Sequence, residues 1–63
     1  MQTIDTAPKD GSMVILANGP DEPGELGWWD AKTQAWLDWR TLYPERFPGP
    51  VAVSPTHWRP HRH

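Results

Sequence analysis

Short apolar runs, separated by residues that form turns, make up most of this chain. Residues 12–17 form one such run with β-branched members, bounded by Gly11 before it and by Asn18-Gly19-Pro20 after it. A run of this length with turn signals at both ends predicts a strand. Further strands are predicted over residues 2–5, 25–30 and 34–39, with a short edge strand at 51–53 and a closing strand at 55–60.

The stretch Pro8-Lys9-Asp10-Gly11 predicts a tight turn between the first two strands. Proline presets its own φ, aspartate accepts hydrogen bonds from nearby amides, and glycine takes a positive φ without strain. Together they are typical of a hairpin in which a type I turn is followed by a left-handed glycine. Lys9 and Asp10 then form either an exposed recognition loop or a turn needed only for folding, and the second interpretation is favoured.

Four of the five tryptophans fall in residues 28–39, where two strands are expected to form a hairpin. Asp30 stands between these strands, and its carboxylate is suited to an Asx turn. A helix over residues 30–42 is the main alternative. The apolar positions there form no i, i+3, i+4 stripe, so the hairpin is favoured.

The second strand of this hairpin carries aromatic rings on both faces. Period 2 places Leu37 and Trp39 on one face, and Trp36 and Asp38 on the other. Either both faces of the sheet are covered, or one row of aromatic side chains is exposed to a partner. The side chains expected in the core are Val14, Leu16, Trp28 or Trp29, Leu37, Trp39 and Trp58.

Two loops interrupt the strands. Residues 18–24 combine proline, glycine and acidic residues, which predicts an exposed acidic tip. Residues 40–54 contain three prolines, so no helix longer than one turn is expected there. A loop of this length in a small domain is often functional, and its apolar residues Leu42, Tyr43 and Phe47 are expected to pack down onto the sheet.

These elements predict an all-β fold, a small antiparallel meander or partly open barrel of four to five short strands. Residues 1–60 would form one domain, and residues 61–63 a basic C-terminal tail. A chain of 63 residues buries only a small core, and the absence of cysteine excludes disulfides and cysteine-based metal sites. A homodimer or higher homo-oligomer is therefore expected, because association would cover open strand edges and aromatic side chains.

The charge pattern limits the classes of partner. The net charge of −2 arises from interspersed acidic and basic residues, which gives little attraction to nucleic acid. The longest apolar run, residues 13–17, is far too short to span a membrane, and residues 1–5 do not look like a signal peptide. A cytoplasmic location without a membrane partner is expected.

Two separated motifs carry a resemblance to a known family. Residues 4–11 read Ile-Asp-Thr-Ala-Pro-Lys-Asp-Gly, and residues 56–60 read Thr-His-Trp-Arg-Pro. In this order they resemble a domain of unknown function found in short proteins of phages and prophages. The family usually has a tryptophan shortly before the isoleucine and Leu-Pro after the second motif, and this chain has neither. The resemblance implies a phage or prophage origin, action inside the host bacterial cell, and interference with host defence as a common role of such small proteins.

The candidate binding residues are charged or aromatic: Lys9, Asp10, Trp29, Trp36, Arg40, His57 and Arg59. Neither a nucleophile beside a base nor a phosphate-binding glycine loop is evident, so the chain is not expected to be an enzyme or to need a cofactor. His57, His61 and His63 are conceivable metal ligands, but a hydrogen-bonding role in the strand is favoured for His57, and no metal is expected.

Three functions of different classes remain open. The favoured hypothesis is a non-catalytic protein-binding module that inhibits a host bacterial defence protein, using the acidic residues 21–25 and exposed aromatic side chains. The second is a binder of a nucleotide or other small molecule, which would use tryptophan stacking and arginine contacts. The third is an accessory of virion structure or assembly.

The two family-like motifs are expected to meet in space, because antiparallel pairing of the first and last strands covers sheet edges. In the favoured arrangement, Thr56 and His57 bond to the turn at residues 6–11 while Trp58 packs beneath it. The alternative is that both motifs line one ligand pocket, with Lys9, Asp10, His57 and Arg59 facing solvent.

Overall fold

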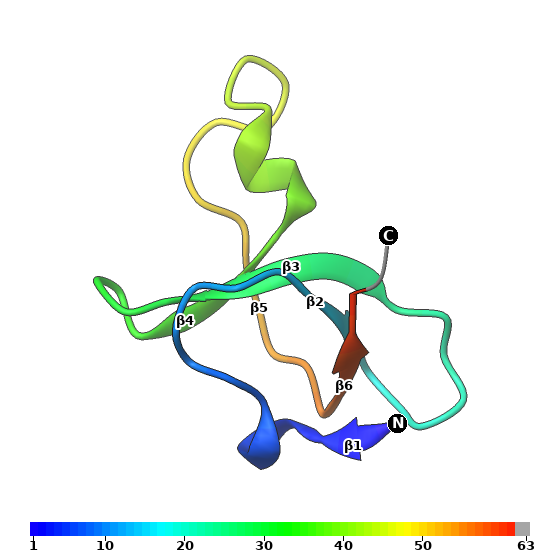
Figure 1. Cartoon of the computed structure of the whole chain (residues 1–63). Coiled ribbons are helices and arrows are strands. Elements are labelled where there is room, and N and C mark those ends of the chain that lie inside the picture. The colour runs from blue at the N-terminus through cyan, green and yellow to red at the C-terminus, as the bar shows by residue number, and fades with distance from the viewer. Residues whose placement is uncertain (62–63) are drawn as a thin grey trace.

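The computed structural model describes residues 1–61, in which six short antiparallel strands form one open sheet (Figure 1). The all-β prediction is confirmed. In chain order the elements are β1 Gln2–Thr3, the 3-10 helix η1 Ile4–Thr6, β2 Val14–Ala17, β3 Glu25–Asp30, β4 Ala35–Asp38, the 3-10 helix η2 Trp39–Leu42, β5 Ala52–Val53 and β6 His57–Pro60. No helix in this part of the chain is long and apolar enough to cross a lipid bilayer. Of the predicted basic tail, only His61 belongs to the described residues.

Strands β2, β3, β4 and β5 form a meander of neighbouring strands. The hairpin between β3 and β4 has the predicted turn. The carboxylate of Asp30 accepts a bond from Lys32 N at 3.4 Å and one from Thr33 Oγ1 at 2.7 Å. The bond from Thr33 lowers the pKa of the Asp30 carboxyl below its ordinary value. Gln34 closes the turn with a φ of 53°, a left-handed conformation that is uncommon for a residue with a side chain.

The predicted hairpin between the first two strands is not formed. The sheet order is β1-β6-β2-β3-β4-β5, so β6 lies between β1 and β2 and pairs with both. The local turn chemistry was nevertheless right: Gly11 has a φ of +85°, and Asp10 accepts a bond from Ser12 N at 3.0 Å. Because β1 and β2 stand two strand spacings apart, a tight turn cannot join them, and the chain crosses the gap through η1 and residues 7–13.

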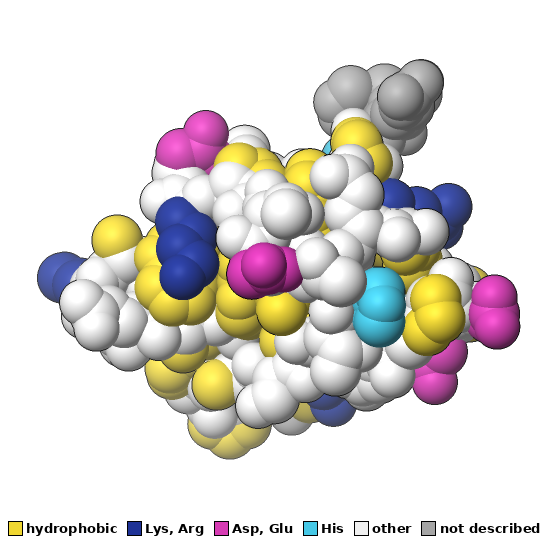
Figure 2. Space-filling model, turned by 90° about the horizontal axis from the view of Figure 1, so that it is seen from below, with side chains coloured by type: hydrophobic (Ala, Val, Ile, Leu, Met, Phe, Trp, Pro, Cys, Tyr) yellow, Lys and Arg dark blue, Asp and Glu magenta, His cyan; other side chains and the backbone are white. Residues whose placement is uncertain are grey.

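One face of the sheet packs against the N-terminal segment and forms the core. The register places Trp29, Trp36 and Val53 side by side, and Leu16 beside Trp58. The buried cluster consists of Ala7, Val14, Leu16, Trp36 and Trp58, with Ile4, Trp29 and Val53 packed against it. Seen from the side of η1 and β1, basic and acidic side chains are scattered among hydrophobic ones on the surface (Figure 2).

The prediction of core residues was largely right, with one exchange. Val14, Leu16, Leu37 and Trp58 are buried as expected. Trp39, also expected inside, is 36% exposed, whereas Trp36 is buried. The reason is that β4 ends at Asp38 and η2 begins at Trp39, so the Trp39 side chain no longer follows the alternation of the strand.

The N-terminal segment is held over the core by its bonds to β6 and to the residue before it. Ile4 N donates to Thr56 O at 3.0 Å, and the indole Nε1 of Trp58 donates to Thr6 Oγ1 at 3.0 Å. The Thr6 hydroxyl in turn donates to Thr3 O at 2.8 Å. The two family-like motifs therefore meet as predicted, and Trp58 lies in the core beside Ala7.

The long loop after β4 does not pack down onto the sheet as expected. It projects from the sheet with η2 at its base (Figure 1), and it returns to the sheet through β5. Leu42 is 52% exposed and Tyr43 is 46% exposed. Only Phe47 of the three apolar residues is half-buried, and its ring contacts Trp39 within the loop itself.

The hydrogen bond between Trp58 and Thr6 can be tested with a double-mutant cycle. Thr6→Val removes the hydroxyl and leaves the indole N–H without its acceptor, which should cost about 1–3 kcal/mol in the free energy of unfolding. Thr6→Val and Trp58→Phe combined should cost less than the sum of the two single changes, because both remove the same bond. Urea unfolding measures all three variants. Thr6→Ser, which keeps the hydroxyl, should stay close to wild type, and strictly additive costs would contradict the bond.

Gly27 provides a second test, at the point where β2 and β4 approach β3. A Cβ at this position would lie 2.5 Å from Leu37 O and closer still to the Leu16 side chain. Because the carbonyl belongs to a paired strand, it cannot move aside, and Gly27→Ala should destabilise the fold by about 1–3 kcal/mol. Gly19→Ala is the control, since the nearest atom to its Cβ is Glu22 Cγ at 3.9 Å. Equal unfolding midpoints for the two variants would contradict this packing.

Candidate functional site

A cavity of about 280 Å³ opens at one end of the core face, between the acidic loop of residues 18–24 and the start of η2. We call it the acidic pocket, because the charged side chains among its described lining residues are three carboxylates and one guanidinium. Its lining residues are Leu16, Ala17, Asn18, Glu22, Pro23, Gly24, Glu25, Asp38, Arg40, Val53 and Pro55. The volume is close to the lower end of the range for small-ligand sites.

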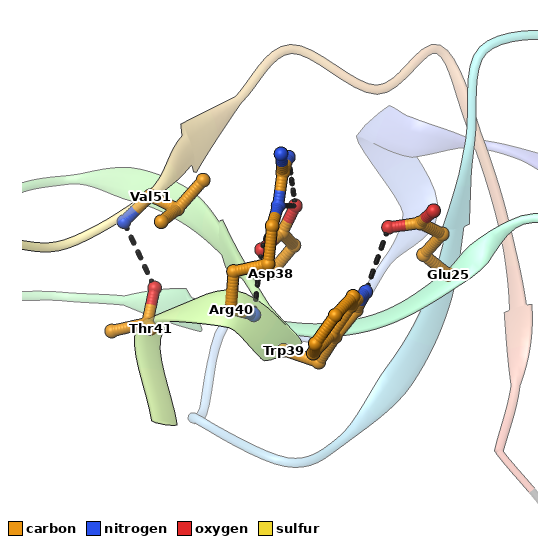
Figure 3. A network of polar contacts seen from close by, with 6 residues as sticks. All are labelled: Glu25, Asp38, Trp39, Arg40, Thr41 and Val51. Atoms are coloured by element: carbon orange, nitrogen blue, oxygen red, sulfur yellow. Dashed lines mark hydrogen bonds and ion pairs between the residues drawn. The ribbon is translucent and has the colours of Figure 1, made fainter. Parts of the chain in front are cut away.

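Asp38 and Arg40 form a tight ion pair in the wall of the acidic pocket (Figure 3). Asp38 is 2% exposed, and it is the one buried charged residue in the described chain. Its Oδ2 accepts bonds from Arg40 Nη2 at 2.6 Å and from Nε at 3.0 Å. These bonds and the negative charge of Asp38 raise the pKa of the Arg40 guanidinium.

The same carboxylate begins η2. Asp38 is the N-cap residue, and its Oδ1 accepts a bond from Arg40 N at 2.9 Å. A carboxylate at this position satisfies one of the backbone amides that the first turn leaves without a partner. Asp38 therefore fixes both the direction in which η2 leaves the sheet and the place of the Arg40 side chain.

Two further bonds hold the projecting loop to the sheet (Figure 3). The indole Nε1 of Trp39 donates to Glu25 Oε2 at 2.9 Å, which joins η2 to the first residue of β3. Val51 N donates to Thr41 Oγ1 at 2.9 Å, which joins the returning strand to η2. Both ends of the loop are thus held in place, although much of its surface faces solvent.

The projecting loop carries a cluster of apolar side chains, which we call the aromatic loop: Trp39, Leu42, Tyr43 and Phe47. The ring of Trp39 lies 6.0 Å from that of Tyr43 and 5.9 Å from that of Phe47, both edge to face. Such pairs are favourable arrangements of aromatic rings. The aromatic loop borders the acidic pocket, because Trp39 is bonded to the pocket residue Glu25.

Three of the candidate binding residues come together elsewhere in the structure. The Nζ of Lys9 lies 4.4 Å from the centre of the Trp29 ring, a cation–π contact. The Trp29 ring meets that of Trp36 edge to face at 5.2 Å. Trp36 is buried in the core, so it packs beneath the Trp29 ring and is not accessible to a partner.

The remaining candidates each contact a residue outside the candidate set, although His57 and Arg59 stand two positions apart in β6. Asp10 bonds to Ser12, whose hydroxyl and amide lower the pKa of the Asp10 carboxyl. His57 Nδ1 lies 2.9 Å from Thr56 Oγ1, and Arg59 Nη2 donates to Pro23 O at 3.0 Å. The predicted bond from His57 to the turn at residues 6–11 is thus replaced by a contact with its own neighbour. Among residues 1–61, Lys9, Asp10 and His57 line neither the acidic pocket nor a shallow pocket that Arg59 lines with Ile15, Pro60 and His61.

Arg40 is the one candidate that lines the acidic pocket. Asp38 and Trp39 were missed as site residues, because a carboxylate inside an apolar strand and a tryptophan at its end were assigned to the sheet. The spacing Asp38-x-Arg40 was the available signal, since an acid two residues before a base at a strand end suits a capped turn. Among residues 1–61, no group of three or more histidine, aspartate or glutamate side chains is placed to hold a metal ion. His63, one of the three candidate metal ligands, lies outside the described residues.

Comparison of the chain with protein-family models, with curated proteins and with solved structures finds no match. The resemblance to phage and prophage proteins, carried by residues 4–11 and 56–60, therefore stays a prediction. What the chain does has to be inferred from the acidic pocket and the aromatic loop.

The ion pair between Asp38 and Arg40 can be tested by removing its positive partner. Arg40→Gln leaves the buried Asp38 carboxylate without its guanidinium, and an unpaired buried charge is strongly unfavourable. We expect a clear fall in the urea midpoint of unfolding. The control is Arg46→Gln, at an exposed arginine within the same projecting loop. Arg40→Lys should lie between the two, because lysine keeps the charge but not the forked donor geometry. Equal midpoints for Arg40→Gln and Arg46→Gln would show that the pair does not stabilise the fold.

Proposed function

We propose that the chain is a non-catalytic protein-binding module that docks through its aromatic loop. The observation that carries the proposal is the exposure of Leu42 and Tyr43, 52% and 46%, at the C-terminal end of η2 in the projecting loop. Aromatic side chains are enriched at protein interfaces, where a few of them provide most of the binding energy. Apolar side chains that gather on a projection, rather than lying singly on the surface, are typical of an interaction site.

The aromatic loop is also tied to the sheet by polar contacts within the chain itself. The Asp38–Arg40 pair caps η2, Glu25 accepts the Trp39 indole bond, and Val51 bonds to Thr41. A surface that is already ordered loses less conformational entropy on association, so more of the contact energy appears as affinity. The three polar contacts thus have a role in binding, although the loop that they hold lies largely outside the core.

Binding of a nucleotide is less well supported. Stacking on tryptophan would need a free arginine beside the ring to meet the phosphates. Arg40 is engaged by Asp38, and Arg59 donates to Pro23 O. The acidic pocket beside Trp39 also holds three carboxylates against one guanidinium, and these would repel a phosphate group.

The class of partner follows from the resemblance to phage and prophage proteins. If the chain acts inside a host bacterium, a host protein is the expected partner, and inhibition of a defence protein is the expected outcome. A role as an accessory of virion assembly would use the same surface on a phage protein. Self-association as a homodimer remains a separate prediction, motivated by the small core, the open sheet edges and the aromatic side chains, of which the first two do not involve the aromatic loop.

The aromatic loop is tested by making its two most exposed side chains polar. The double variant Leu42→Ser/Tyr43→Ser should lose most of the partner captured from host lysate, while its thermal unfolding midpoint stays close to wild type. The control is Met13→Ser, which removes an apolar side chain of similar exposure, 42%, outside the loop. Capture is quantified by mass spectrometry of the proteins retained by each variant.

Retention of the same partner by Leu42→Ser/Tyr43→Ser would overturn the proposal, as would an equal loss in Met13→Ser. Light scattering of the same samples tests self-association independently. A homodimer at tens of micromolar (about the range for a modest interface) is expected for wild type and for the double variant alike, and a monomeric wild type would refute it.

A further inference from the structure

We infer that the acidic pocket receives a lysine or arginine side chain of the partner protein that docks on the aromatic loop. The inference rests on the proposed function and names the chemistry of the partner. The pocket and the aromatic loop are continuous, since Trp39 belongs to the loop and bonds to Glu25 in the pocket at 2.9 Å. A partner that covers one therefore lies over the other.

The walls of the acidic pocket suit a long side chain that is apolar along its stem. Its apolar lining includes Leu16, Ala17, Val53 and Pro55, and all of these but Val53 are buried. Lysine and arginine place several methylene groups between the backbone and the charge, and these groups pack well on apolar surface. The volume of about 280 Å³ is ample for one such side chain.

The charges in the acidic pocket favour a cation. Asp38 and Arg40 neutralise each other through the bonds described above. Among the lining residues, Glu22 and Glu25 remain as the excess negative charge, and both belong to the rim formed by residues 22–25, to which the Arg59 guanidinium is bonded through Pro23 O. Among the described residues, the Glu22 carboxylate has no hydrogen-bond or ion-pair partner, so it is available to a cation from outside.

A small anion and a metal ion fit the acidic pocket less well. An anion could reach Arg40, whose side chain is 39% exposed, only in the presence of three carboxylates. A metal ion would need further oxygen ligands, but Asp38 is occupied by Arg40, and the described residues contain no converging group of three histidine or acidic side chains. A cation on an apolar stem uses both the apolar lining and the free carboxylate.

The test is a titration followed by two-dimensional amide NMR with N-acetyl-argininamide, and with N-acetyl-citrullinamide as a probe of the same shape without the charge. N-acetyl-argininamide should shift the resonances of Ala17, Glu22 and Arg40 and saturate with a Kd of about millimolar order, a range expected for a single side chain. N-acetyl-citrullinamide should bind at least about tenfold more weakly. Raising the salt concentration should weaken binding of the charged probe only.

The matched variants are Glu22→Gln and Asp21→Asn. They remove one negative charge each from neighbouring exposed positions, but only Glu22 lines the acidic pocket. Glu22→Gln should weaken N-acetyl-argininamide binding about threefold or more, and Asp21→Asn should leave it nearly unchanged. Equal affinity for the two probes, or equal losses in the two variants, would overturn the inference.

The outcome for the acidic pocket is separable from that for the aromatic loop. Leu42→Ser/Tyr43→Ser should still bind N-acetyl-argininamide like wild type, even though it loses the captured partner. Glu22→Gln should reduce capture of the partner without abolishing it. If Glu22→Gln loses the probe but captures the partner as well as wild type does, the partner inserts no basic side chain, and docking on the aromatic loop stands alone.

Discussion

Trp58 lies where the two ends of the described chain meet, and the arrangement of the sheet depends on its burial. Its strand pairs with β1 on one side and with β2 on the other. A buried indole contributes about 150–250 Å² of apolar contact, a large part of what so short a chain can bury. Its N–H needs an acceptor, which Thr6 supplies, and Thr6 in turn bonds to Thr3. One side chain thus connects β1, η1, β6 and β2.

The sequence predicted local structure well and the order of strands poorly. The bounds of β3 agree with the structure because Gly24 and Asp30 mark its two ends with turn chemistry. The Asx turn and the left-handed Gly11 are likewise decided by residues within a few positions. The partner of β1 is decided by contacts with residues more than fifty positions away, and no pattern within residues 2–5 distinguishes β2 from β6 as a neighbour. Pairing of the first and last strands was expected on the general ground that open edges are unfavourable.

The candidate site was predicted only in part, for a physical reason. Alternation divides the residues of β4 into two faces, but it does not say which face is inside, nor where the strand ends. Trp36, predicted as a binding residue, is therefore buried, and Trp39, predicted for the core, is exposed. Leu42 and Tyr43 were expected to pack down onto the sheet because they are apolar, yet apolar residues also make up a large share of protein surfaces. Arg40 was recognised as a candidate, whereas its partner Asp38 was not, because an acidic residue in a strand is ordinarily exposed to solvent.

The position of β6 inside the sheet has a consequence for truncated forms of the protein. The meander of β2 to β5 consists of neighbours in sequence, whereas β1 and β2 both have β6 as a neighbour. Without residues 57–60, β2 presents an open edge of apolar residues, and β1 has no strand beside it. An exposed edge of this kind pairs readily with other chains. A fragment that ends before β6 is therefore expected to aggregate instead of forming a smaller folded domain.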